Sequence, residues 1–177
     1  MRTRFWMALW VAALAMAGAA YAAPANTAFE GKVVRVLDGA TLAVRTAAKG
    51  EVLVRLRDID PPELCQPWGA ESMKGLIDLA LGHNVRVQPA GRDGEGRVVA
   101  RVLMDGVDLG PRQVEDGHAW SVRGRSDRGP LVKQERMAKA LSRGLHAGGG
   151  AVLPKEFRSR HGPCAAGEAP AAGAQRG

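Results

Sequence analysis

The chain has 177 residues, with 25 Lys and Arg against 18 Asp and Glu, and a formal net charge of +7. This length allows one folded domain with its own core, and the two cysteines lie in no Cys-x-x-Cys or Cys/His pattern, which argues against a zinc site. A basic surface favours anionic partners such as nucleic acid, although charge alone is weak support for such a function.

The first 22 residues have the pattern of a secretory signal peptide. A basic start precedes an uncharged apolar run from Phe5 to Gly18, and Ala20-Tyr-Ala22 is a typical small-residue cleavage site. The run is short for a membrane span, which disfavours an uncleaved anchor. We expect cleavage after Ala22, export to the periplasm or the medium, and no stable membrane insertion afterwards. Loss of two arginines leaves 23 basic against 18 acidic residues, a net charge of +5.

The first predicted strands surround a tight turn. After a short lead at residues 23–30, strand patterns at 32–37 and 41–46 flank Asp38-Gly39, and Asp-Gly is a strong hairpin signal. A third strand follows over residues 51–58, in which Val and Leu alternate with other residues. This alternation places Arg55 on the face opposite the core, where its charge stays in contact with water.

The second half of the chain predicts helices and two further strands. Apolar spacing and turn residues define helices at 69–81, 109–116 and 131–143 and strands at 85–87 and 97–104. Five strands, with one helix between the third and fourth, describe an α+β, mainly β, fold: a five-stranded OB-fold barrel with about three helices. We expect this domain to span residues 31–147. Residues 148–177 are rich in Gly, Ala and Pro, which predicts a largely disordered tail.

One strand and the turn after it carry the residues of most chemical interest. Arg55 is followed by Asp60 and Glu63, and Arg97 lies downstream beside another tight turn. Arginines bind phosphate bidentately, one carboxylate can hold a hard divalent cation, and the other can deprotonate water. The set therefore suits attack on a phosphodiester. Each residue alone also has a structural explanation, such as an ion pair, a turn residue or an exposed strand residue.

In their order and spacing these motifs resemble the thermonuclease family, the staphylococcal-nuclease-like domains. The resemblance covers residues 31–145. It is carried by Asp38-Gly-Ala-Thr41, Arg55-Leu56 leading into Asp60-Pro-Pro-Glu63, Gly69, Asp93-Gly-Glu-Gly-Arg97, and Gly117-His-Ala-Trp120 before Gly144-Leu-His146. It implies an OB-barrel endonuclease that hydrolyses DNA or RNA with Ca²⁺, and we expect a monomer. By position, Glu63 would be the general base, and Arg55 and Arg97 would hold the scissile phosphate.

The metal half of the implied site departs from the family pattern. Asp60 and the backbone carbonyl of Pro61 would be Ca²⁺ ligands, and Asp38 would lie in the outer shell or compensate for a missing ligand. Ala40 stands where the family has its other Ca²⁺-binding Asp. Ca²⁺ affinity falls with the number of charged oxygens, so the alternative function is a catalytically weakened or inactive OB-fold module that binds nucleic acid or another polyanion.

Two more features concern substrate and covalent structure. The positions of family tyrosines are taken here by Glu95, Arg123 and Arg125, and the two arginines are assigned to substrate binding, which should then fall steeply with salt. In an exported protein Cys65 and Cys164 suggest a disulfide, which would tie the C-terminal tail beside the acidic turn. The alternatives are two free thiols or partners in another chain.

Overall fold

A computed structural model describes residues 27–124, 129–162 and 164. The predicted signal peptide, the first half of the short lead, Arg125 and the end of the predicted tail lie outside the described residues. Among the residues described, no helix is both long and apolar enough to cross a bilayer.

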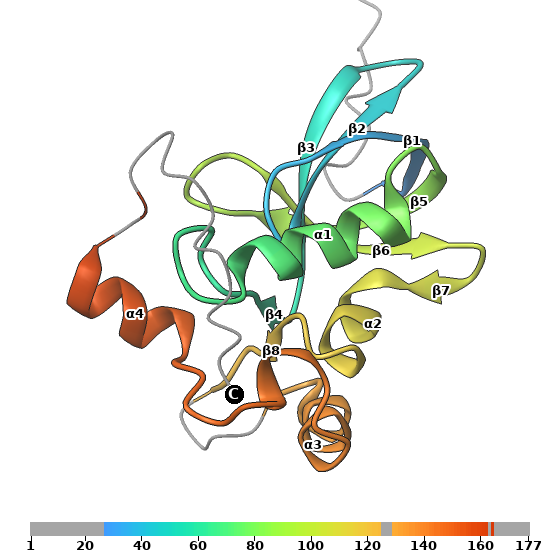
Figure 1. The fold of residues 1–177 in the computed structure, drawn as a ribbon. Coiled ribbons are helices and arrows are strands. Elements are labelled where there is room, and N and C mark those ends of the chain that lie inside the picture. The colour runs from blue at the N-terminus through green and yellow to red at the C-terminus, as the bar shows by residue number, and fades with distance from the viewer. Residues whose placement is uncertain (1–26, 125–128, 163, 165–177) are drawn as a thin grey trace, which may run out of the picture.

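Five strands form a closed barrel, which confirms the predicted OB-type fold (Figure 1). They are β1 (Phe29–Val36), β2 (Thr41–Thr46), β3 (Gly50–Leu56), β5 (Asn84–Arg92) and β6 (Val98–Met104). Neighbours pair antiparallel in the order β3-β2-β1-β5-β6, and a parallel pairing between β3 and β6 closes the ring. Strand β5 is longer than predicted because the register shifts between Pro89 and Gly91, a place where a sheet tolerates a proline.

Three two-residue strands extend the sheet system. Strand β7 (Val107–Asp108) pairs with β6, and β4 (Ile59–Asp60) pairs with β8 (Trp120–Ser121). In the β4–β8 pair Asp60 lies opposite Trp120, which is almost completely buried. The barrel end that carries Asp60 is therefore fixed to the segment after α2.

Helix α1 runs across the barrel in Figure 1, and the other helices follow the strands in the chain. They are α1 (Gly69–Ala80), α2 (Leu109–Glu115), α3 (Val132–Ala140), the short 3-10 helix η1 (Gly144–His146) and α4 (Pro154–His161). The first three helices match the sequence prediction within a few residues. Helix α4 corrects it, because the segment beyond Ala147 was expected to lack regular structure. Proline at the first position of α4 supplies a local start signal.

The core lies between the barrel strands and α1. Alternate residues of β2, β3 and β6 point inward, and α1 contributes Leu76 and Ala80. Gln113 of α2 is a buried polar side chain, and its amide donates to the carbonyls of Gly39 (2.9 Å) and Ser72 (3.2 Å). This buried amide joins the β1–β2 turn, α1 and α2 beside the barrel end considered next.

Candidate active site

Three of the predicted residues meet at one end of the barrel. Arg55 projects from β3, Asp60 ends β4, and Glu63 follows three residues later. The Arg55 Nη2 atom lies 3.9 Å from Asp60 Oδ1. The side chains of these three residues are each about one quarter exposed, at 26%, 25% and 25%. A polar cluster at this depth keeps access to water while its electrostatic interactions are stronger than at a fully exposed surface.

The turn that carries Glu63 is held by its own backbone. Glu63 N donates to the Gln66 side chain (3.2 Å), and Gln66 N donates to the Glu63 carbonyl (2.9 Å). Gly69 then begins α1 directly against this turn. A Cβ at Gly69 would lie 2.1 Å from the Glu63 carbonyl oxygen, so the position accepts only glycine without a shift. The turn and the start of α1 thus set the place of the Glu63 carboxylate together.

Arg97 lies on the same outer face as Arg55 but has its own partner. Because Val54 pairs with Val98 in the parallel β3–β6 ladder and both are buried, the residues next to them point outward. Arg97 Nε donates to Asp93 Oδ2 at 2.7 Å, and Arg97 N donates to Asp93 Oδ1 at 3.0 Å. Burial works to raise the pKa of Asp93, but these bonds lower it overall. Within the described residues, Arg97 makes no ion pair with Asp60 or Glu63.

The predicted outer-shell residue Asp38 lies in the turn that packs on Pro61. A Cβ on Gly39 would lie 2.7 Å from Pro61 Cβ and 1.9 Å from Ser72 Oγ, which shows how closely the two segments approach. Asp38 Oδ1, however, accepts from Ala40 N at 2.7 Å, so it caps its own turn. The Ala40 methyl is fully buried in the core cluster.

This donor set does not fit a calcium site. Ca²⁺ takes six to eight oxygens, commonly from several carboxylates. In the described part of the chain no three His, Cys, Asp or Glu side chains gather closely enough to hold a metal. Asp38 Oδ1 is engaged by its own turn, Ala40 offers no side-chain oxygen, and Asp60 lies between two guanidinium groups.

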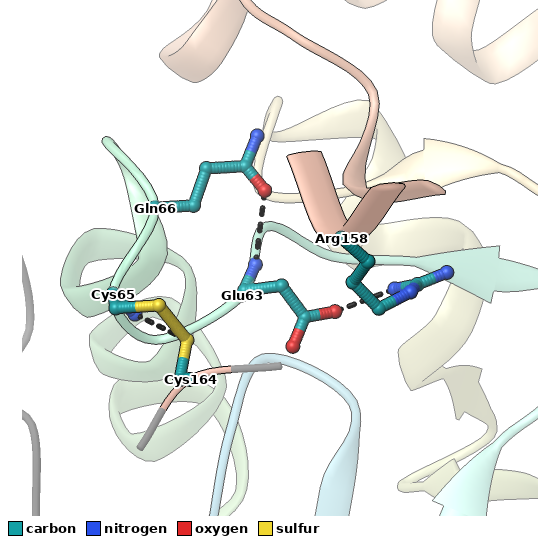
Figure 2. Close-up of a disulfide and its surroundings, with 5 residues drawn as sticks. All are labelled: Glu63, Cys65, Gln66, Arg158 and Cys164. Carbon is teal, nitrogen blue, oxygen red and sulfur yellow. Dashed lines mark hydrogen bonds and ion pairs between the residues drawn. A yellow bond between two sulfur atoms is a disulfide. The ribbon is translucent and has the colours of Figure 1, made fainter. Parts of the chain in front are cut away.

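The second guanidinium belongs to Arg158 of α4, which the sequence reading missed. Arg158 Nη1 lies 2.5 Å from Glu63 Oε1 and 3.7 Å from Asp60 Oδ1 (Figure 2). Burial raises the pKa of the Asp60 carboxyl, and the charges of Arg158 and Arg55 reduce this shift without cancelling it. The sequence does contain a signal for this contact. A Cys65–Cys164 bond brings the residues before Cys164 close to the acidic turn, and the three basic residues within 155–160 are the natural partners of the carboxylates in that turn.

The structure joins Cys65 and Cys164 by a disulfide, with an S–S distance of 2.05 Å and a Cα–Cα distance of 5.6 Å. Cys65 lies two residues after Glu63, so the C-terminal segment is bound covalently to the turn that carries Glu63 (Figure 2). The sequence predicted that such a disulfide would hold the C-terminal tail beside this turn, and α4 is the part of the tail that lies there.

Arg123, assigned to substrate from the sequence, is held by a buried acid. Its Nη2 pairs with Glu135 Oε1, and the side chain of Glu135 is only 1% exposed. Glu135 also accepts from Ser121 N at 3.0 Å and pairs with Lys139 at 2.6 Å. Because Ser121 lies in β8, Glu135 braces the strand that pairs with Asp60. Arg125 lies outside the described residues.

Comparison with known proteins points in one direction. The family model for staphylococcal nuclease homologues matches residues 53–147. The chain is 33% identical over 127 residues to a protein of Oryza sativa subsp. japonica named "Probable staphylococcal-like nuclease CAN3", a match over 69% of this chain and 34% of that protein. It thus spans about a third of the length of this plant relative.

Two bacterial relatives match over more of their length. An "Uncharacterized endonuclease" of Haemophilus influenzae is 32% identical over 127 residues, covering 72% of this chain and 71% of that protein. An Escherichia coli protein with the same description is 34% identical over 131 residues, covering 73% of this chain and 85% of that protein. With a family model over more than half of its length and relatives that bear nuclease names, the chain belongs to the family of staphylococcal nuclease homologues.

Proposed function

We propose that this protein is an endonuclease that hydrolyses phosphodiester bonds of DNA or RNA. The observation that carries the proposal is the meeting of Arg55, Asp60 and Glu63 at one end of the barrel. Family membership supplies the reaction class, and this cluster supplies groups with suitable chemistry.

In the proposed reaction Glu63 takes a proton from water, and the resulting hydroxide attacks phosphorus in line with the leaving oxygen. Arg55 and Arg97 donate to the non-bridging oxygens and offset the charge that grows in the transition state. Asp93 holds Arg97 in position through two hydrogen bonds and so acts as a positioning residue. Asp60 keeps the Arg55 guanidinium at the barrel end.

That calcium assists the reaction is a prediction that follows from the family resemblance alone. The carbonyl of Pro61 and the carboxylate of Asp60 are the ligands that the resemblance implies, but their surroundings do not fit the ion as arranged. No step of the reaction is therefore assigned to a metal. Replacement of the buried Ala40 by Asp tests this directly: if a missing ligand limits the reaction, Ala40→Asp should make cleavage respond to calcium at lower concentration.

A binding module without turnover is the second candidate function. Two observations favour it: Ala40 contributes no ligand, and Arg158 neutralises Glu63. Such a module would bind single-stranded DNA with an affinity that falls steeply with salt and does not respond to chelator. The endonuclease would release fragments instead.

The decisive experiment incubates the purified protein with single-stranded DNA and with RNA, in millimolar calcium or in excess chelator. Glu63→Gln should lower the rate of cleavage by about 10²-fold or more and leave binding nearly unchanged, because it removes the base but keeps the shape. Glu30→Gln, on the exposed face of β1, is the matched control and should behave as the wild type. Unchanged cleavage by Glu63→Gln would remove the base assignment, and binding without cleavage by the wild type would select the second function.

We also propose that the protein is exported after removal of residues 1–22. The support is the basic, apolar and small-residue pattern of that segment. Mass spectrometry of the protein recovered from a producing bacterium should give a mature chain that begins at Ala23. Recovery of the full-length chain from the cytoplasm alone would contradict this.

A further inference from the structure

Helix α4 lies over the acidic turn through three separate ties. Before the helix, the carbonyl of Val152 accepts from Gln66 Nε2 at 2.5 Å. Within it, Arg158 binds Glu63. After it, Cys164 is bonded to Cys65. All three partners fall within residues 63–66, so the C-terminal segment closes on the turn that carries the proposed base (Figure 2). We call Val152, α4 and Cys164 the C-terminal clasp.

The clasp has little packing of its own. Within α4 only Pro154 is buried, and Phe157 packs against His161 of the same helix, with ring centroids 4.6 Å apart. Figure 1 shows the helix to one side of the molecule, away from the barrel. With so little apolar contact, the ties to the turn determine where the helix lies. The disulfide is the strongest of them, because it keeps Arg158 at high effective concentration beside Glu63.

The position of Arg158 conflicts with the chemistry of the turn. A base that accepts a proton from water needs a free carboxylate oxygen directed toward that water. Here Glu63 Oε1 is paired with Arg158, and the same guanidinium nitrogen lies near Asp60 Oδ1. The cation also takes the place beside these carboxylates that a divalent ion would need. In the clasped form a cation thus occupies one of the two oxygens of the proposed base and bridges toward Asp60.

We propose that the C-terminal clasp is an autoinhibitory device that opens when the Cys65–Cys164 disulfide is reduced. This inference rests on the proposed function for its effect on catalysis, but not for its structural effect. Without the covalent tie, the described part of the clasp keeps the partly exposed ion pairs of Arg158 with Glu63 and Asp60, one hydrogen bond and the buried Pro154. Ion pairs and single hydrogen bonds at a wet surface are each worth little. Arg158 then leaves the turn, and Glu63 and Asp60 become accessible to water, cations and substrate.

The opening step is a thiol–disulfide exchange with a dithiol reductant. A thiolate of the dithiol attacks one sulfur, the S–S bond breaks, and the other cysteine leaves as a thiolate that takes up a proton. The second thiol of the reagent then displaces the first cysteine. The reagent gives up two electrons and two protons and becomes a cyclic disulfide, and Cys65 and Cys164 become thiols.

The test compares the oxidised protein with protein reduced by dithiothreitol and alkylated with iodoacetamide. Trypsin cleavage after Lys155 and Arg158 reports the clasp, and cleavage of single-stranded DNA reports the site. Reduction should speed release of the α4 peptides and raise the DNA cleavage rate, each by roughly tenfold, because the effective concentration of the tether is lost. Cys164→Ser should reproduce both effects without reductant.

Two arginine variants separate inhibition from other roles. Arg158→Ala should raise cleavage by the oxidised protein and make it nearly insensitive to reductant. Arg160→Ala, on the same helix and paired with Glu156, is the control and should match the wild type. A lower cleavage rate in Arg158→Ala would overturn the proposal and make Arg158 a phosphate ligand.

Failure of the clasp and failure of the nuclease assignment remain distinguishable. If α4 is digested at the same rate in oxidised, reduced and Cys164→Ser protein, the clasp is refuted whatever the activity. If digestion responds to reduction but no variant cleaves DNA or RNA in either state, the clasp stands as a cover of the turn and the proposed function fails.

Discussion

Replacement of Gly69 by alanine tests how firmly the start of α1 positions the proposed base. Helix propensity alone predicts that Ala would stabilise this position by up to about 1 kcal/mol. The structure predicts the opposite, since the new Cβ would lie 2.1 Å from the Glu63 carbonyl oxygen. Relief of that clash requires a movement of about 1 Å, and overpacking of this kind costs about 1–3 kcal/mol. For a domain of this size the melting temperature should fall by about 3 to 9 °C.

The same movement should be visible in catalysis. A misplacement of about 1 Å at a catalytic group costs on the order of 10²-fold in rate, so kcat/KM for single-stranded DNA should fall by about that factor. Thermal melts by circular dichroism and initial rates on the same preparation give both numbers. Gly148→Ala is the control, since its Cβ would meet nothing within 4 Å. An unchanged or higher melting temperature in Gly69→Ala, with kcat/KM within about twofold of the wild type, would refute this reasoning.

Three further outcomes follow from buried and positioning groups. Glu135→Gln should destabilise the protein by about 2–4 kcal/mol in urea denaturation, because it leaves two cations facing a neutral amide in a buried site; a loss below about 0.5 kcal/mol would contradict this. Burial lowers the pKa of His118 from its ordinary value of 6.5, although the charges of nearby acids act to raise it. The stability that neutral His118 contributes is therefore present above pH 6.5 and is lost as the pH falls below that value. His118→Gln should flatten this pH dependence, whereas the exposed His83→Gln should not. Asp93→Asn should lower kcat/KM about tenfold with little change in melting temperature, because Arg97 loses its charged partner, and an unchanged kcat/KM would show that Arg97 needs no such support.

Local sequence signals predicted most of the barrel. Asp38-Gly39 predicts a hairpin because Asp-Gly suits the few tight turns that can join two adjacent antiparallel strands. The alternation of buried and exposed residues in β3 determines the face on which Arg55 lies. The family motifs located Arg55, Asp60 and Glu63 at one site, and the structure brings these three together. Their proposed roles still await the experiments described above.

The parts that the sequence did not predict depend on contacts between distant segments. Strand β4 has only two residues and exists because β8 pairs with it, so no periodic pattern marks it. Helix α4 is short, polar and flanked by glycine-rich sequence, and its place is set by Cys164 rather than by an apolar face. The hydrogen bond that ties Asp38, the predicted outer-shell or compensating residue, to its own turn likewise has no signal in the sequence.

The parallel pairing of β3 with β6 has a consequence for how the protein folds. Helix α1 and strand β5 separate Val54 from Val98 along the chain, so barrel closure is a non-local event with a high cost in loop entropy. Arg55 lies in β3 beside this seam, and Arg97 lies immediately before β6. A partly folded chain, with the first hairpin formed and the seam open, would hold apart the two arginines that we propose bind phosphate. We therefore expect phosphate affinity to appear late in refolding, together with closure, and not with the early hairpin.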